Sequence, residues 1–180
     1  MHDLTEGVTR FRRDVYPAKA ELFAHLAATH RPETLFISCS DARVVPELIT
    51  QSEPGELFVI RTAGNLVPPY ADGPDGVAAG IEYALAVLGV TDIVVCGHSA
   101  CGAMTALAER HDLSTAPAIA HWLRHAAPSP GSDVDALVRE NPVARALAAG
   151  SVTLHAWVYD IATGTVEELD PAGPCPALAG

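Results

Sequence analysis

Apolar and polar residues follow one another in blocks that predict strands and helices in turn. Three short runs have an apolar centre, as expected of strands covered on both faces of a sheet. They span residues 34–38, 55–61 and 91–98. Residues 21–30 and 75–89 instead place their apolar side chains at helical spacing, which resumes over 101–110. This alternation predicts an α/β fold with a mainly parallel sheet flanked by helices.

Weaker signals complete the pattern towards both ends of the chain. Pro46 in the first turn indicates a short helix over 44–51, and Gly150 closes a helix predicted over 142–150. Residues 152–160 alternate like a strand, and 163–169 indicate a turn into a final edge strand. No element is predicted for residues 111–133, which are rich in Pro, Ser and Ala.

Composition limits the possible classes of protein. The 180 residues suit one domain, and 49% hydrophobic with 18% charged residues is a globular composition. The net charge of −11 opposes nucleic-acid binding, and no basic cluster offsets it. No apolar run reaches the ~20 residues that span a bilayer, and the N-terminus lacks a hydrophobic signal core. The four cysteines are too few for a disulfide scaffold, so we expect a cytoplasmic protein with available thiols.

Two short motifs carry candidate chemistry at the ends of predicted strands. "CSDAR" begins at Cys39, and "HSAC" runs from His98 to Cys101. Ligands of α/β folds bind beyond the carboxyl ends of the strands, and zinc prefers thiolate and imidazole ligands. The helix that starts at Cys101 should also favour its thiolate form. These three side chains are therefore candidate zinc ligands; three protein ligands would leave one position for water, as in catalytic sites. A lone H-x-x-C motif would be explained equally well by a buried His and a buried Cys that serve only the core.

Asp41 and Arg43 lie two positions apart within "CSDAR", so they can pair and fix the carboxylate. A loop-stabilising salt bridge would produce the same pair. Their place beside a candidate metal ligand favours a role in the site.

The chain resembles the β-class carbonic anhydrases over residues 10 to 170. The matching segments are "CSDARVVPELI", "PGELFVIRTAGNLVPPY", "GIEYALAVLGVTDIVVCGHSACGAM" and "LHAWVYDIATG". The resemblance implies one β-carbonic anhydrase-like domain over 1–180, with an N-terminal helical arm over 1–30 that wraps a partner subunit. It implies a homodimer or a dimer of dimers.

The resemblance also implies the activity, which is zinc-dependent reversible hydration of carbon dioxide to bicarbonate and a proton. Zn²⁺ would be bound by Cys39, His98 and Cys101. Zinc-bound hydroxide would attack carbon dioxide, oriented by Asp41, while Arg43 holds Asp41 in place. In some family members the Asp swings onto the metal and closes the site at low pH.

The resemblance leaves a substrate pocket to be assigned. We expect it to involve His30, Val67, Tyr70 and Gly102. His30 stands where relatives often carry a Gln that binds substrate, although a histidine satisfied by helix carbonyls would fit the position equally well. The region 133–142 is shorter than in most relatives.

Other functions share parts of this pattern. A related zinc hydrolase acting on carbon disulfide or carbonyl sulfide would keep the same ligands. A non-catalytic zinc or bicarbonate-binding homologue would need neither Asp41 nor Arg43. A cysteine-based phosphatase is disfavoured, because its loop requires a longer reach from Cys to Arg and a run of backbone donors.

Overall fold

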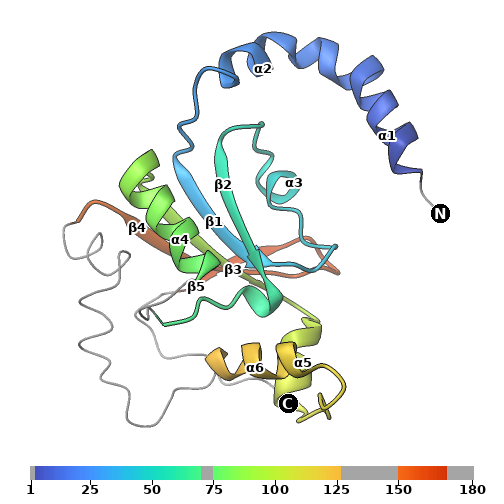
Figure 1. Ribbon diagram of the computed structural model, residues 1–180, viewed down its shortest axis with the longest axis vertical. Helices are drawn as coiled ribbons and strands as arrows, with labels where there is room; N and C mark the ends of the chain where they lie inside the picture. The colour runs from blue at the N-terminus through green and yellow to red at the C-terminus, as the bar shows by residue number, and fades with distance from the viewer. Residues whose placement is uncertain (1–2, 70–74, 127–149, 170–180) are drawn as a thin grey trace. The chain divides into compact units, whose positions relative to one another are not determined.

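The computed structural model describes residues 3–69, 75–126 and 150–169 (Figure 1). It divides into two compact units, Met1–Arg31 and Pro32–Gly180. The helix predicted over 142–150 and the short region 133–142 lie outside the described residues. Among the described residues, no helix has the length and apolar character needed to cross a bilayer.

The N-terminal unit is helical, as predicted. It contains α1 (Leu4–Arg10), a π-helical turn (Phe11–Val15), a 3-10 turn (Tyr16–Lys19) and α2 (Ala20–Leu26). Asp3 caps α1 by accepting a 2.9 Å hydrogen bond from the amide of Thr5. The helix predicted over 21–30 ends earlier, at Leu26, because the amides of Ala28 and Thr29 bond three residues back and tighten the last turn.

The larger unit is built on a five-stranded sheet of order β2-β1-β3-β4-β5. The strands are β1 (Thr34–Cys39), β2 (Leu57–Thr62), β3 (Asp92–His98), β4 (Thr153–Tyr159) and β5 (Val166–Leu169). All neighbours pair in parallel except β4 and β5, which are antiparallel. This confirms the predicted mainly parallel sheet and its edge strand.

The strand order changes direction beside β1. The chain passes from β1 to β2 on one side and then crosses to β3 on the other side. The carboxyl ends of β1 and β3 therefore form the crevice in which α/β sheets bind ligands. Cys39 ends β1 and His98 ends β3.

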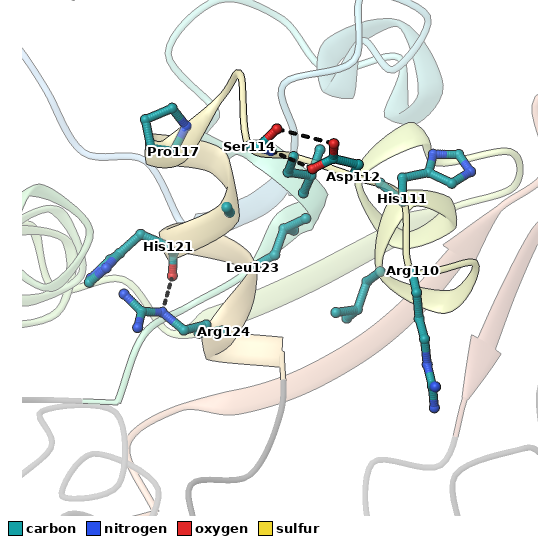
Figure 2. Close-up of a pocket in the computed structure, with 12 residues that line it drawn as sticks. Arg110, His111, Asp112, Ser114, Pro117, His121, Leu123 and Arg124 are labelled. Atoms are coloured by element: carbon teal, nitrogen blue, oxygen red, sulfur yellow. Dashed lines mark hydrogen bonds between the residues drawn. The ribbon is translucent and has the colours of Figure 1, made fainter.

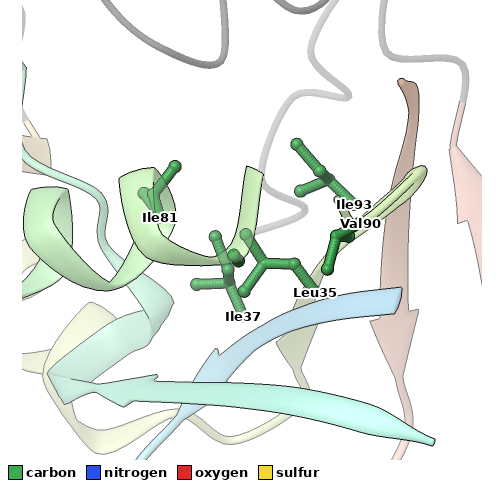
Figure 3. Close-up of a cluster of buried hydrophobic side chains, with 6 residues drawn as sticks. Leu35, Ile37, Ile81, Val90 and Ile93 are labelled. Carbon is green, nitrogen blue, oxygen red and sulfur yellow. The ribbon is translucent and has the colours of Figure 1, made fainter. Parts of the chain in front are cut away.

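One face of the sheet is covered by α4 (Gly76–Glu82) and the π-helical turn Tyr83–Leu88 that continues it. Leu35, Ile37 and Ile93 of the sheet pack with Ile81 of α4 (Figure 3). Sequence analysis predicted one helix over 75–89, and its end at Gly89 is confirmed by a left-handed φ of 73°. The change to π-helical geometry was not predicted.

Three further helices among the described residues follow β1 or β3 along the chain. They are α3 (Pro46–Thr50), α5 (Gly102–Ala108) and α6 (Pro117–Trp122), the last continued by a 3-10 turn over Leu123–Ala126. The first two were predicted. Helix α6 was not predicted, although Pro117 stands in its first turn, where proline favours a helix start.

The edge of the sheet carries an ionic contact that makes stability depend on pH. His155 of β4 shares a 2.8 Å hydrogen bond between its Nδ1 atom and Oε1 of Glu168 on β5. Its Nε2 atom lies 3.5 Å from Oδ1 of Asp92 on β3. The bond to Glu168, more than the contact with Asp92, raises the pKa of His155 above its ordinary value.

We expect this contact to stabilise the fold more at slightly acid than at alkaline pH. The folded-state pKa of His155 exceeds its unfolded value, so the contribution is complete below about pH 6.5 and is lost as the pH rises through the folded value. The same bond lowers the pKa of Glu168, so Glu168 loses its charge, and the contact is weakened, only in acid. His155→Gln should lower the unfolding midpoint more at about pH 6 than at about pH 8.5.

Thermal unfolding of the wild type and of His155→Gln at the two pH values measures the loss in unfolding midpoint. His111→Gln is the matched control, because within the described part of the chain the ring of His111 bonds only its near neighbour Glu109. An equal loss for His155→Gln at both pH values would contradict the assignment.

Candidate metal centre

The three candidate ligands converge in the crevice at the carboxyl ends of β1 and β3. One ligand atom from each of Cys39, His98 and Cys101 lies within 4.8 Å of the other two. All three residues are buried, with exposed fractions of 5%, 8% and 7%. Cys101 reaches the cluster as the N-cap of α5. The structure thus brings together residues from two strands and one helix.

The imidazole of His98 is oriented for metal binding. Its Nδ1 atom lies 2.9 Å from the carbonyl oxygen of Ser99. A carbonyl can only accept, so Nδ1 carries the proton and Nε2 presents a lone pair. Nε2 is buried and has no hydrogen-bond partner among the described residues. A cation held by this nitrogen and two sulfurs would satisfy it, and zinc suits that donor set.

The thiol of Cys101 is subject to two opposing influences. Burial is the largest influence on its pKa, and it raises that pKa above the ordinary value for cysteine. The amides of Met104 and Ala103 at the start of α5 oppose this shift, as the predicted helix effect requires, but they do not outweigh burial. The helix start alone therefore does not make Cys101 a thiolate.

Asp41 and Arg43 form a forked ion pair beside the cluster. The guanidinium donates from Nε to Oδ1 at 2.9 Å and from NH2 to Oδ2 at 2.6 Å, and the Arg43 amide also donates to Oδ1 at 2.9 Å. These bonds hold the pKa of Asp41 well below its usual range. Oδ2 lies 4.0 Å from Nε2 of His98, so the ionised carboxylate borders the metal centre.

Arg43 is itself fixed by the loop that carries Cys101. Its NH2 atom also donates to the carbonyl oxygen of Ala100 at 3.1 Å. Ala100 has a left-handed φ of 53°, which is uncommon for a residue with a side chain. The Asp–Arg pair is thus tied to both motifs that supply the ligands.

Arg61, at the end of β2, was missed by the sequence analysis. Its guanidinium donates to three carbonyl oxygens of the loop after β1, those of Cys39 at 3.0 Å, Asp41 at 2.6 Å and Val44 at 2.7 Å. The loop that holds a ligand and the ion pair is therefore clamped from the neighbouring strand. Contacts of a side chain with distant carbonyls leave no motif in the sequence.

The four residues predicted for the substrate pocket lie in different parts of the chain. Gly102 is the first residue of α5, and no atom lies within 4 Å of where its Cβ would be, apart from its own neighbours. Val67 packs against the core cluster under α4. Tyr70 lies outside the described residues. His30 belongs to the N-terminal unit.

A cavity of about 840 Å³ lies elsewhere, between α5 and α6. Figure 2 shows Arg110 and His111 on one side of it and His121 and Arg124 on the other, with Leu123 between them. None of the three candidate ligands lines it. The chemistry indicated by the donor set therefore belongs to the crevice and not to this cavity.

Comparisons with known proteins agree with this geometry. The family model for carbonic anhydrase matches residues 34–133. The carbonic anhydrase of Pseudomonas aeruginosa is 52% identical in an alignment that covers 96% of this chain and 89% of that protein. The solved structure of the β-carbonic anhydrase CcaA superposes with a TM-score of 0.80 at 38% identity, covering 93% of each chain. The chain belongs to the β-class carbonic anhydrase family.

A tetrameric β-carbonic anhydrase from the ascomycete Sordaria macrospora has the same fold, with a TM-score of 0.73 at 29% identity over 92% of this chain and 94% of that one. In this β-carbonic anhydrase the buried Cys–His–Cys cluster is typical of the zinc site of the family. Zinc is therefore the cofactor that the donor set and the family both indicate.

Proposed function

We propose that this chain catalyses the reversible hydration of carbon dioxide to bicarbonate and a proton, at one zinc ion held by Cys39, His98 and Cys101. The proposal rests on one observation. Two buried cysteine sulfurs lie close to an imidazole nitrogen that has no hydrogen-bond partner among the described residues. This cluster occurs in a chain that is 52% identical in sequence to a known carbonic anhydrase.

When bound, zinc supplies Lewis-acid activation of water, which makes hydroxide available near neutral pH. The protein supplies the position of each donor. Ser99 fixes the tautomer of His98 through its carbonyl, and the end of β1 fixes Cys39.

Asp41 orients the nucleophile. Its low pKa keeps the carboxylate ionised at neutral pH, so it can only accept hydrogen bonds. A carboxylate that accepts a hydrogen bond from the attacking oxygen directs a lone pair of that oxygen towards carbon dioxide. Arg43 keeps the carboxylate ionised and in one pose through its forked bonds.

We propose His30, Val67, Tyr70 and Gly102 as residues of the substrate pocket. The open space around the Cβ position of Gly102, next to the ligand Cys101, supports its assignment. For His30, Val67 and Tyr70 the support is the family resemblance of the segments that contain them.

We further propose a homodimer or dimer of dimers in the cytoplasm, made of a single domain with residues 1–30 as an arm towards the partner. Large apolar side chains of the N-terminal unit support the proposal. Leu4 is 82% exposed, Val8 60%, Val15 43% and Phe11 40%. A second copy would cover such a surface.

Stopped-flow measurement of carbon dioxide hydration tests the proposed activity, from about pH 6.5 to about 9, which brackets the range in which zinc makes hydroxide available. We expect rapid hydration by the zinc protein and none above background after zinc removal by a chelator. A zinc-loaded protein that hydrates no carbon dioxide but hydrolyses carbon disulfide would replace the proposal with the related hydrolase.

A further inference from the structure

One peptide group links a distant tryptophan to a candidate zinc ligand. The amide of Gly64 donates to Sγ of Cys39, with nitrogen and sulfur 3.4 Å apart. The carbonyl of the same peptide group, which belongs to Ala63, accepts a 2.8 Å hydrogen bond from the indole Nε1 of Trp122. The order of contacts is therefore indole N–H, peptide carbonyl, peptide N–H and thiol sulfur.

The backbone around this peptide group is held in one conformation. Gly64 has φ of 70°, in the left-handed region that favours glycine. A Cβ atom at Gly64 would lie 2.5 Å from Cε of Met104 and 3.3 Å from Cβ of Ala103, both on α5. The 63–65 turn is therefore close against α5, with the Gly64 N–H directed at the sulfur.

The two hydrogen bonds reinforce each other. A donor at the carbonyl oxygen polarises the peptide group and makes its N–H a stronger donor, and burial strengthens the effect because the local dielectric is low. Cys39 is 5% exposed, so water screens its sulfur little. A hydrogen bond to a ligand sulfur withdraws charge from it and fixes its direction, as outer contacts of metal ligands do.

We propose that Trp122 is a positioning residue of the zinc site, acting on Cys39 through the Ala63–Gly64 peptide group. The inference rests on the proposed function, because it takes Cys39 to be a zinc ligand. Trp122 lies on α6, the helix that the sequence did not predict, and its bond to Ala63 ties that helix to the metal centre.

Trp122→Phe tests the proposal, since it removes the indole N–H and keeps an aromatic ring. The probe is Co²⁺ in place of zinc, because thiolate-to-cobalt charge transfer gives a near-ultraviolet band that reports charge on the sulfurs. Weaker hydrogen bonding raises the energy of the sulfur lone pair, so the band should move to longer wavelength. The amide proton of Gly64 in the zinc protein should move upfield in NMR spectra.

Trp157→Phe is the matched control. Trp157 packs against Phe36, and its Nε1 atom has no hydrogen-bond partner among the described residues. In Trp157→Phe we expect the wavelength of the cobalt band and the NMR shift of the Gly64 amide proton to stay at their wild-type values. A second variant, with benzothienylalanine at position 122, keeps the shape of tryptophan without its N–H and should reproduce the shifts of Trp122→Phe.

The outcomes separate this inference from the proposed function. Wild-type protein that binds Co²⁺ without a thiolate charge-transfer band would refute the ligand assignment itself. A wild-type band that is unmoved in both variants at position 122 would refute the role of Trp122. Equal shifts in Trp157→Phe would also overturn it, because they would reflect general packing.

Discussion

Cys101→Ser should purify with little zinc, against one ion per chain in the wild type. The substitution replaces a soft sulfur donor with a hydroxyl that zinc binds poorly. Two protein ligands, Cys39 and His98, then remain of the three whose donor atoms lie within 4.8 Å of one another. Elemental analysis of purified proteins measures the zinc content per chain.

Cys96→Ser is the matched control. Cys96 is also fully buried, on β3, but it lies outside the donor cluster and packs with Phe36 and Val94. It should keep one zinc per chain even if the fold is less stable. Unchanged zinc content in Cys101→Ser would refute the assignment of that ligand.

Asp41→Asn should keep its zinc and lose hydration activity by about 100-fold or more, the range expected for a group that positions a proton in the transition state. The amide nearly preserves the size of the side chain but removes the charge that Arg43 holds in a forked pair. An amide can also donate to the attacking oxygen and so favour the wrong orientation. Stopped-flow hydration assays and zinc analysis on the same samples separate the two effects.

Asp112→Asn supplies the comparison for this experiment. The carboxylate of Asp112 bonds Ser114 in its own loop, and that contact lowers the pKa of Asp112. Its variant should hydrate carbon dioxide at the wild-type rate. Full activity in Asp41→Asn would remove Asp41 from the mechanism, and loss of zinc there would show that Asp41 supports the ligands.

The cluster of candidate ligands could be predicted from the sequence because the fold leaves a simple local signal at its members. Cys39 and His98 each follow an apolar run, and neighbouring parallel strands end at the same edge of a sheet. Cys101 follows His98 by three residues, which is enough for the chain to leave the strand and start a helix. The Asp41–Arg43 pair is likewise local in sequence.

The supports of the site could not be predicted, because they join segments far apart in the chain. Arg61 meets three carbonyls of the 39–44 loop, and Trp122 meets the carbonyl of Ala63. Neither contact produces a period or a motif. The sequence likewise marks the helix start that lowers the pKa of Cys101, but not the degree of burial that outweighs it.

Two sulfurs and one imidazole nitrogen of a single chain are expected to bind the zinc ion. Zinc K-edge X-ray absorption of the purified enzyme measures the ligand atoms directly. We predict two sulfur neighbours at about 2.3 Å and light-atom neighbours at about 2.0 Å, with one imidazole contributing its outer-shell pattern. A spectrum fitted by nitrogen and oxygen neighbours alone would contradict the account.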